Sequence, residues 1–165
     1  MAFDCFLKIE GLPGESTDDK HKDWIELLSY SHGVSQPSSG STSSGGGRTA
    51  ERCDHQDFSV VKTLDKASPK LNLFCCNGTH IKEVKVELCR AGTDKQKYME
   101  YKMTDCIISS VRPGGSAQGG EALPLEEVSF AYLKIEWIYT PTDHKTGKPG
   151  GDVPAYWDLE LNKGA

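Results

Sequence analysis

The stretch VSFAYLKIEWIY, residues 128–139, decides the fold class of this sequence. Apolar or aromatic side chains occupy every second position in its C-terminal part, namely Ala131, Leu133, Ile135, Trp137 and Tyr139. A period of two is typical of a β-strand, because successive side chains of a strand point to opposite faces of the sheet. The pattern therefore predicts the longest strand of the protein here, with these five side chains on one face.

The same alternation recurs along the rest of the chain and is interrupted by turn-forming residues. It predicts further strands at residues 3–10, 24–32, 58–61, 81–90, 98–103 and 156–161, with 106–111 continuing or restarting the strand at 98–103. The strand at 24–32 carries apolar residues on both faces, which favours cover on two sides. Seven or eight strands with turns between them predict a mainly β fold, either an antiparallel β-barrel or a two-sheet sandwich, in one domain over 1–165.

One short helix interrupts the strands. Ser68 is expected at the N-cap, Pro69 at the first helical position, and Gly78 after the last turn. An apolar stripe follows the spacing i, i+3, i+4 and consists of Leu71, Phe74 and Cys75. A helix of about nine residues is marginal in isolation, so we expect this one to pack against the sheet by its stripe.

The run SQPSSGSTSSGGG, residues 35–47, contains ten Ser or Gly residues among its thirteen. Such a composition buries too little apolar surface to offset the entropy lost on ordering. Long excursions of this kind are uncommon inside a compact domain unless they bind something or stay disordered. Two readings stay open: a mobile surface loop, or a loop that orders only against a partner.

The composition of the chain argues against several kinds of function. The 165 residues include 19 Lys and Arg against 24 Asp and Glu, a net charge of −5, which argues against binding to nucleic acid or to an anionic membrane surface. The sequence has neither a run of 18 apolar residues nor a signal peptide at its start, so no stable membrane insertion and a cytoplasmic origin are expected. The six cysteines contain no Cys-x-x-Cys pair and are expected to be free thiols in a reducing compartment.

Searches for catalytic and metal-binding patterns find none. Gly147-Lys148 resembles the end of a phosphate-binding loop, but Thr142 and Pro149 stand where that motif requires Gly and Ser or Thr. The five histidines lack the spacing of a metal site and are expected to be solvated or structural. We therefore predict no catalytic residue, no metal ligand and no cofactor.

Long strings of this sequence closely resemble the Hcp proteins, the tube subunits of type VI secretion systems. The matching runs are GESTDDKHKDWIELLSYSHGVSQP (14–37), DKASPKL (65–71), ELCRAGTDKQKYMEYKMTDCIISSVRPGG (87–115), LEEVSFAYLKIEWIYTPTD (125–143) and TGKPGG (146–151). The resemblance covers nearly the whole chain and rests on strings far longer than a short motif.

That resemblance implies a β-barrel of two antiparallel sheets with a short helix and a long extended loop. It also implies hexameric rings that stack into a tube inside a contractile sheath on a baseplate, capped by a VgrG spike. Small effectors ride in the ring lumen of some relatives, and the family core has no catalytic activity. The protein would be cytoplasmic until the sheath contracts, and would then be secreted without a signal peptide.

Assembly needs surfaces that contact other copies. The loop at about 33–52 is the candidate for ring stacking, through Gln36, Arg48, Glu51 and Arg52, and its lack of apolar anchors predicts weak, salt-sensitive stacking. The second apolar face of residues 24–30 is a candidate for another contact. A small-ligand-binding β-barrel is the alternative function, and a small hydrolase is a third class for which we find no Ser/His/acid cluster.

Overall fold

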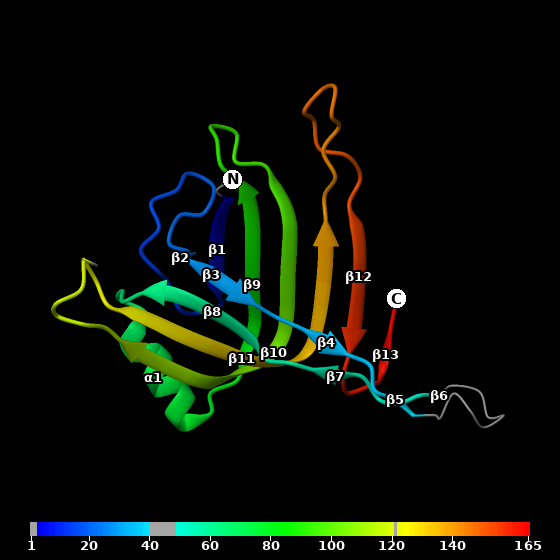
Figure 1. Cartoon of the computed structure of the whole chain (residues 1–165), viewed down its shortest axis with the longest axis horizontal. Coiled ribbons are helices and arrows are strands. Elements are labelled where there is room, and N and C mark those ends of the chain that lie inside the picture. Colours follow the sequence, from blue (N-terminus) through cyan, green and yellow to red (C-terminus); the bar gives the residue numbers. More distant parts are fainter. Residues whose placement is uncertain (1–2, 40–48, 121) are drawn as a thin grey trace.

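The computed structural model describes residues 3–39, 49–120 and 122–165. Antiparallel strands form two layers that face one another, with one short helix beside them (Figure 1). The fold is therefore mainly β, as the alternation predicts. Of the two predicted architectures the two-sheet sandwich fits, because the ladder order runs from one end strand to another without returning to its start.

The first layer contains six strands in continuous antiparallel order. These are β12 (Val153–Asp158), the second half of β11 (Leu125–Tyr139), the first half of β10 (Lys97–Gly114), β9 (Ile81–Arg90), β1 (Phe3–Ile9) and β2 (Ile25–Leu27). A two-residue strand, β13 (Lys163–Gly164), extends the layer beyond β12.

The second layer reuses β10 and β11. β8 (Phe58–Thr63) pairs with the first half of β11, and β3 (Ser29–Ser31) pairs with β8. The layers thus share two strands, which bend from one into the other (Figure 1). At the bend the ladder skips Asp105 and Leu133, and Asp105 adopts a left-handed conformation with φ 53°. The register of the two strands is the same on both sides of this gap, and it shifts between Ile108 and Ser110, where Ser109 is the extra residue of a β-bulge.

This bend changes which side chains face the core. Val128, Phe130 and Tyr132 are buried before it, whereas Ile135 is buried after it. The predicted face of β11 is therefore correct only from Ile135 onward, because the alternation of buried residues shifts by one at the gap in the ladder around Leu133. β10, with 18 residues, is also longer than β11, with 15, since the stretches at 98–103 and 106–111 form one strand.

The segment predicted as one strand at 24–32 consists of β2 and β3. Leu28 separates them, and its amide donates to the carbonyl oxygen of Val61 at 2.8 Å. β2 pairs with β1 in the first layer, and β3 pairs with β8 in the second. The chain therefore crosses between the layers on the side opposite the shared bend.

Helix α1 (Ser68–Asn77) confirms the predicted helix and its C-terminus. Gly78 has φ 66° and its amide donates to the carbonyl of Phe74, which is the expected left-handed ending. The predicted N-cap is wrong: Ala67 occupies that position, and no side chain caps the helix. Ser68 is instead the first helical residue, and its hydroxyl donates to Glu126 Oε2 at 2.8 Å.

The hydroxyl of Ser68 thus contacts a buried ion pair, which is formed by Lys62 and Glu126. Lys62 Nζ lies 2.7 Å from Glu126 Oε2, and both side chains are fully buried. The ammonium group also donates to Asp65 Oδ1 at 3.0 Å and to the carbonyl of Thr63 at 3.1 Å. Lys62 and Glu126 are cross-strand neighbours on β8 and β11. The pair therefore ties the start of α1 to the second layer.

Candidate functional site

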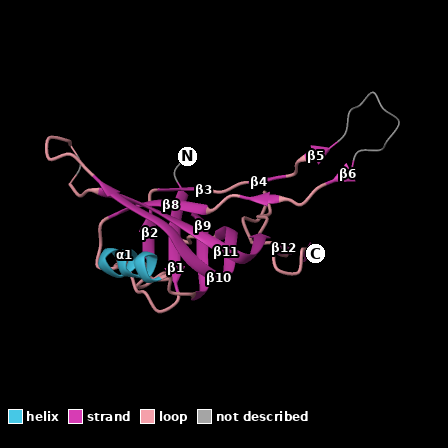
Figure 2. Cartoon of the chain, turned by 90° about the horizontal axis from the view of Figure 1, so that it is seen from below, coloured by secondary structure: helices cyan, strands magenta, loops and turns pink. Residues whose placement is uncertain are grey.

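A hairpin arm leaves the body of the molecule between β3 and β8 (Figures 1 and 2). Its inner ladder joins β4 (Val34–Ser35) to β7 (Asp54–His55), and its outer ladder joins β5 (Ser38–Ser39) to β6 (Thr49–Ala50). We call residues 34–55 the arm. The predicted loop at 33–52 is this arm, and in its described part it is a paired hairpin.

The predicted stacking residues fall in three different situations. Gln36 joins the two sides of the arm, because its amide nitrogen donates to the carbonyl oxygens of Glu51 and Pro37. Glu51 and Arg52 follow the outer ladder, and both side chains are exposed. Arg48 lies outside the described residues. Gln36 is thus a strut of the arm, while Glu51 and Arg52 are available to other chains.

Aromatic rings enclose the root of the arm. The ring of His32, just before β4, lies 5.4 Å from the ring of Phe58 and 5.8 Å from that of Tyr132. His55, in β7, lies with Nδ1 2.8 Å from the hydroxyl of Tyr132. Trp137 flanks His32 at 6.3 Å. Both strands of the arm are therefore anchored in the body by a buried aromatic cluster.

Both histidines of this cluster are held in the neutral form. Burial lowers the pKa of His32, and the nearby His55 lowers it further. Burial also lowers the pKa of His55. Both ring nitrogens of His32 are buried, and the backbone of Gln56 acts on the ring in the opposite direction and raises its pKa. Sequence analysis missed this cluster, although one histidine stands on each side of the Ser/Gly run.

The arm exposes unpaired backbone groups. Each described ladder of the arm has two strands, so every strand has one edge that faces away from its partner. Free strand edges present N–H and C=O groups that can pair with a strand of another chain. The arm is consequently suited to contacts between chains.

A second accessible surface lies at the β12 end of the first layer. Tyr139 and Val153 face each other across β11 and β12 and are 46% and 61% exposed. The apolar face predicted for 24–30 is less extensive than expected. Leu28 is exposed, but Trp24 lies edge-on against the ring of His21 at 4.8 Å, and Tyr30 packs against the core.

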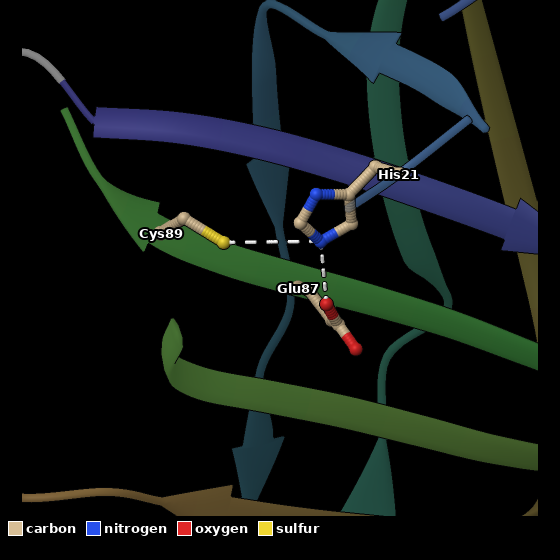
Figure 3. Close-up of side chains that lie close together, drawn as sticks. All are labelled: His21, Glu87 and Cys89. Atoms are coloured by element: carbon tan, nitrogen blue, oxygen red, sulfur yellow. Dashed lines mark hydrogen bonds and ion pairs between the residues drawn. The ribbon is translucent and has the colours of Figure 1, made fainter. Parts of the chain in front are cut away.

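A polar cluster lies beneath the loop between β1 and β2 (Figure 3). His21 Nε2 lies 2.7 Å from Glu87 Oε2 and 3.9 Å from Cys89 Sγ. On the other side of the ring, Nδ1 lies 2.8 Å from Asp18 Oδ2. His21 is buried and hydrogen-bonded, and the structure brings it together with two side chains of β9 that the sequence does not associate with it. All six cysteines are free thiols.

The fold defines a class, namely a mainly β sandwich from which a self-paired hairpin arm projects. A family model described as the type VI secretion system effector Hcp matches residues 6–139. The chain belongs to the Hcp family, and the resemblance found in the sequence is confirmed. It is a tube protein of the type VI secretion system and a secreted protein.

Individual relatives agree with this assignment. Protein hcp1 of Pseudomonas aeruginosa is 36% identical over 163 residues, which is 98% of both chains. A solved type six secretion system protein is 35% identical with a TM-score of 0.92, over 99% of this chain and 100% of the other. Hcp1 from Salmonella typhimurium is 33% identical with a TM-score of 0.81, over the full length of both chains. Within the described residues, α1 is too short and too polar to span a membrane.

Proposed function

We propose that six copies of this chain form a ring and that rings stack into the inner tube of a type VI secretion system. The tube would be expelled from the cytoplasm by contraction of a sheath on a baseplate, with a VgrG spike at its tip. The ring lumen would carry small effectors. Membership of the Hcp family supports each of these steps.

The observation that carries the proposal is the arm. It projects from the body, is anchored at its root, and offers free strand edges and exposed charges at Glu51 and Arg52. A second copy of the chain, in the next ring, is the partner that would cover it. Unlike surfaces that contact head to tail generate rings or open filaments, according to the rotation between copies.

A filled interior disfavours the small-ligand-binding barrel. Large side chains, including Phe58, Phe130 and Ile135, are fully buried between the layers. Small sandwiches and barrels of this kind are packed by their own side chains. The geometry accordingly favours function at the outer surface.

Size-exclusion chromatography with light scattering tests the ring. We expect a mass of about six times the 18.1 kDa of one chain. Neighbours in the ring would meet at the exposed pair Tyr139 and Val153, at the β12 end of the first layer. Tyr139→Asp with Val153→Asp would place two carboxylates in this contact and is expected to give monomers. Leu73→Asp is the matched control, because Leu73 is similarly exposed on α1. A wild-type chain that stays monomeric at high concentration would refute the proposal.

A further inference from the structure

We propose that His21, Glu87 and Cys89 bind a zinc ion that fastens the loop between β1 and β2 to strand β9. The donors are an imidazole nitrogen, a carboxylate oxygen and a thiol sulfur, all within 4.8 Å of one another. Zinc accepts this mixture of N, O and S ligands, and three protein ligands leave a fourth position for water. The proposal does not depend on the assembly of rings.

Distances in the cluster are close to those of a coordination sphere. Zinc bonds of about 2.0 Å to N and O and about 2.3 Å to S place tetrahedral donors roughly 3.3–3.6 Å apart. The observed separations from His21 Nε2 are 2.7 Å to Glu87 Oε2 and 3.9 Å to Cys89 Sγ. Displacements of less than about 1 Å would therefore suffice.

The ring of His21 is already oriented for such a role. Asp18 Oδ2 accepts a hydrogen bond from Nδ1 at 2.8 Å, and Phe6 stacks on the ring at 4.1 Å. A carboxylate on the second nitrogen of a metal-bound histidine is a recurrent outer partner that fixes the ring and its tautomer. The Lys95 ammonium group pairs with Oδ1 of the same carboxylate and fixes its position.

Backbone geometry holds the loop over the cluster. The amide of His21 donates to the carbonyl of Asp18 at 3.2 Å, which closes a tight turn between them. Gly14 allows the loop to fold against Trp24, because a Cβ at residue 14 would lie 2.5 Å from the Trp24 carbonyl oxygen. His21 consequently reaches β9 with little freedom and is itself only 3% exposed.

Charged groups of both signs surround the cluster. The carboxylates of Glu87, Asp18 and Asp4 and the ammonium group of Lys20 all act on Cys89. Lys95 pairs with Asp18, and Lys97 lies 3.9 Å from Glu87. The donor set and its geometry, and not the net charge, therefore mark this cluster as a metal site.

Metal binding would release protons from the ligands. Zinc is bound by thiolate sulfur and by an imidazole nitrogen that carries no proton. Zinc would therefore displace the thiol proton of Cys89 and any proton on Nε2 of His21, and would release them to solvent. Zinc affinity should consequently rise with pH.

Equilibrium zinc binding, measured in competition with a chromophoric chelator, tests the site. The chain should carry Cys75→Ser and Cys76→Ser, which remove two neighbouring accessible thiols of α1. We expect one zinc per chain. Asp18→Asn removes an outer partner of His21 and should weaken zinc binding about 10- to 100-fold. Cys89→Ala removes a ligand itself and should weaken zinc binding by more than about 100-fold. Cys106→Ala is the matched control, since Cys106 is also a buried strand thiol, and should leave binding unchanged.

Cobalt binding tests the same site in the chain with intact Cys89, so the result does not depend on whether the Cys89 variant folds. Cobalt bound to the chain with intact Cys89 should show sulfur-to-metal charge-transfer absorption, and zinc should raise the thermal unfolding midpoint of the same chain. No binding, no sulfur-to-cobalt band, or equal affinity in Cys89→Ala would overturn the proposal. The cluster would then be a set of hydrogen bonds between His21 and its two carboxylate neighbours. None of these outcomes bears on the number of chains in the ring.

Discussion

At the scale of single residues, breaking the buried ion pair between Lys62 and Glu126 is expected to lower the free energy of unfolding strongly. A fully buried charge is tolerated because its partner and several hydrogen bonds compensate for lost hydration. Lys62 is fully buried and has Glu126, Asp65 and the Thr63 carbonyl around its ammonium group. Sequence periodicity did not reveal this pair, because a Lys and a Glu in strands resemble any solvated strand face.

We predict that Lys62→Met lowers the free energy of unfolding by about 3–5 kcal/mol, because Glu126 would remain buried without a counter-charge. The double variant Lys62→Met with Glu126→Leu should recover most of that loss, since no unpaired charge is then left in the core. Chemical denaturation of the wild type and both variants measures the difference. A double variant as unstable as the single one would contradict this account.

The second residue-level prediction concerns pH. The lowered pKa of His32 means that, below its ordinary value of 6.5, the unfolded chain binds more protons than the folded chain. Stability is thus complete above about pH 6.5 and falls as the pH drops below it, by at most about 1.4 kcal/mol per histidine and pH unit. Denaturation at pH 7.5 and 5.5 checks the sign.

His32→Phe should flatten this pH dependence, because phenylalanine fits the aromatic surroundings and does not titrate. His144→Gln serves as the comparison, since His144 is exposed and its removal should leave the slope as it is. A slope that His32→Phe leaves unaltered would mean that the root of the arm does not govern acid stability.

At the scale of elements, the arm has a root packed against aromatic rings and two exposed charges, Glu51 and Arg52, between its ladders. Its described ladders contain two residue pairs each, and Gln36 joins their two sides. Such short ladders are marginal without support. The arm should therefore gain order when another chain pairs with it, at some cost in affinity.

We expect Glu51→Lys with Arg52→Glu to impair ring stacking and to leave the ring intact, since the two charges lie on the arm and not on β12. Analytical ultracentrifugation at low and high salt would follow stacked species, which should weaken as salt rises. Glu10→Lys with Lys82→Glu makes the same exchange of charges at exposed positions outside the arm and should not alter stacking. Loss of the ring itself in the arm variant would contradict the separation of the two contacts.

The elements also show what local pattern can and cannot predict. Strands β1 and β9 lie close to where alternation predicts them, and Gly78 ends α1 as expected. The bend at Asp105 and the break at Leu28 were missed, because each depends on which distant strand pairs there. The predicted N-cap of α1 was wrong for a similar reason, since the hydroxyl of Ser68 donates a hydrogen bond to Glu126, which is distant in the sequence.

At the scale of the whole molecule, long matching strings predicted the family, and the fold agrees with them. The number of strands and their period of two predicted the architecture. The cluster of possible metal ligands could not be predicted, because residues 21, 87 and 89 meet only when the loop folds over β9. Sites that assemble across distant segments leave no local pattern in a single sequence.

The strands β10 and β11 pass through both layers, so covalent backbone joins the two halves of the sandwich at the bend. A push applied to one layer would reach the other along peptide bonds, without relying on side-chain packing to transmit it. If the chain is expelled within a tube, as proposed, its two layers would therefore be expected to move together.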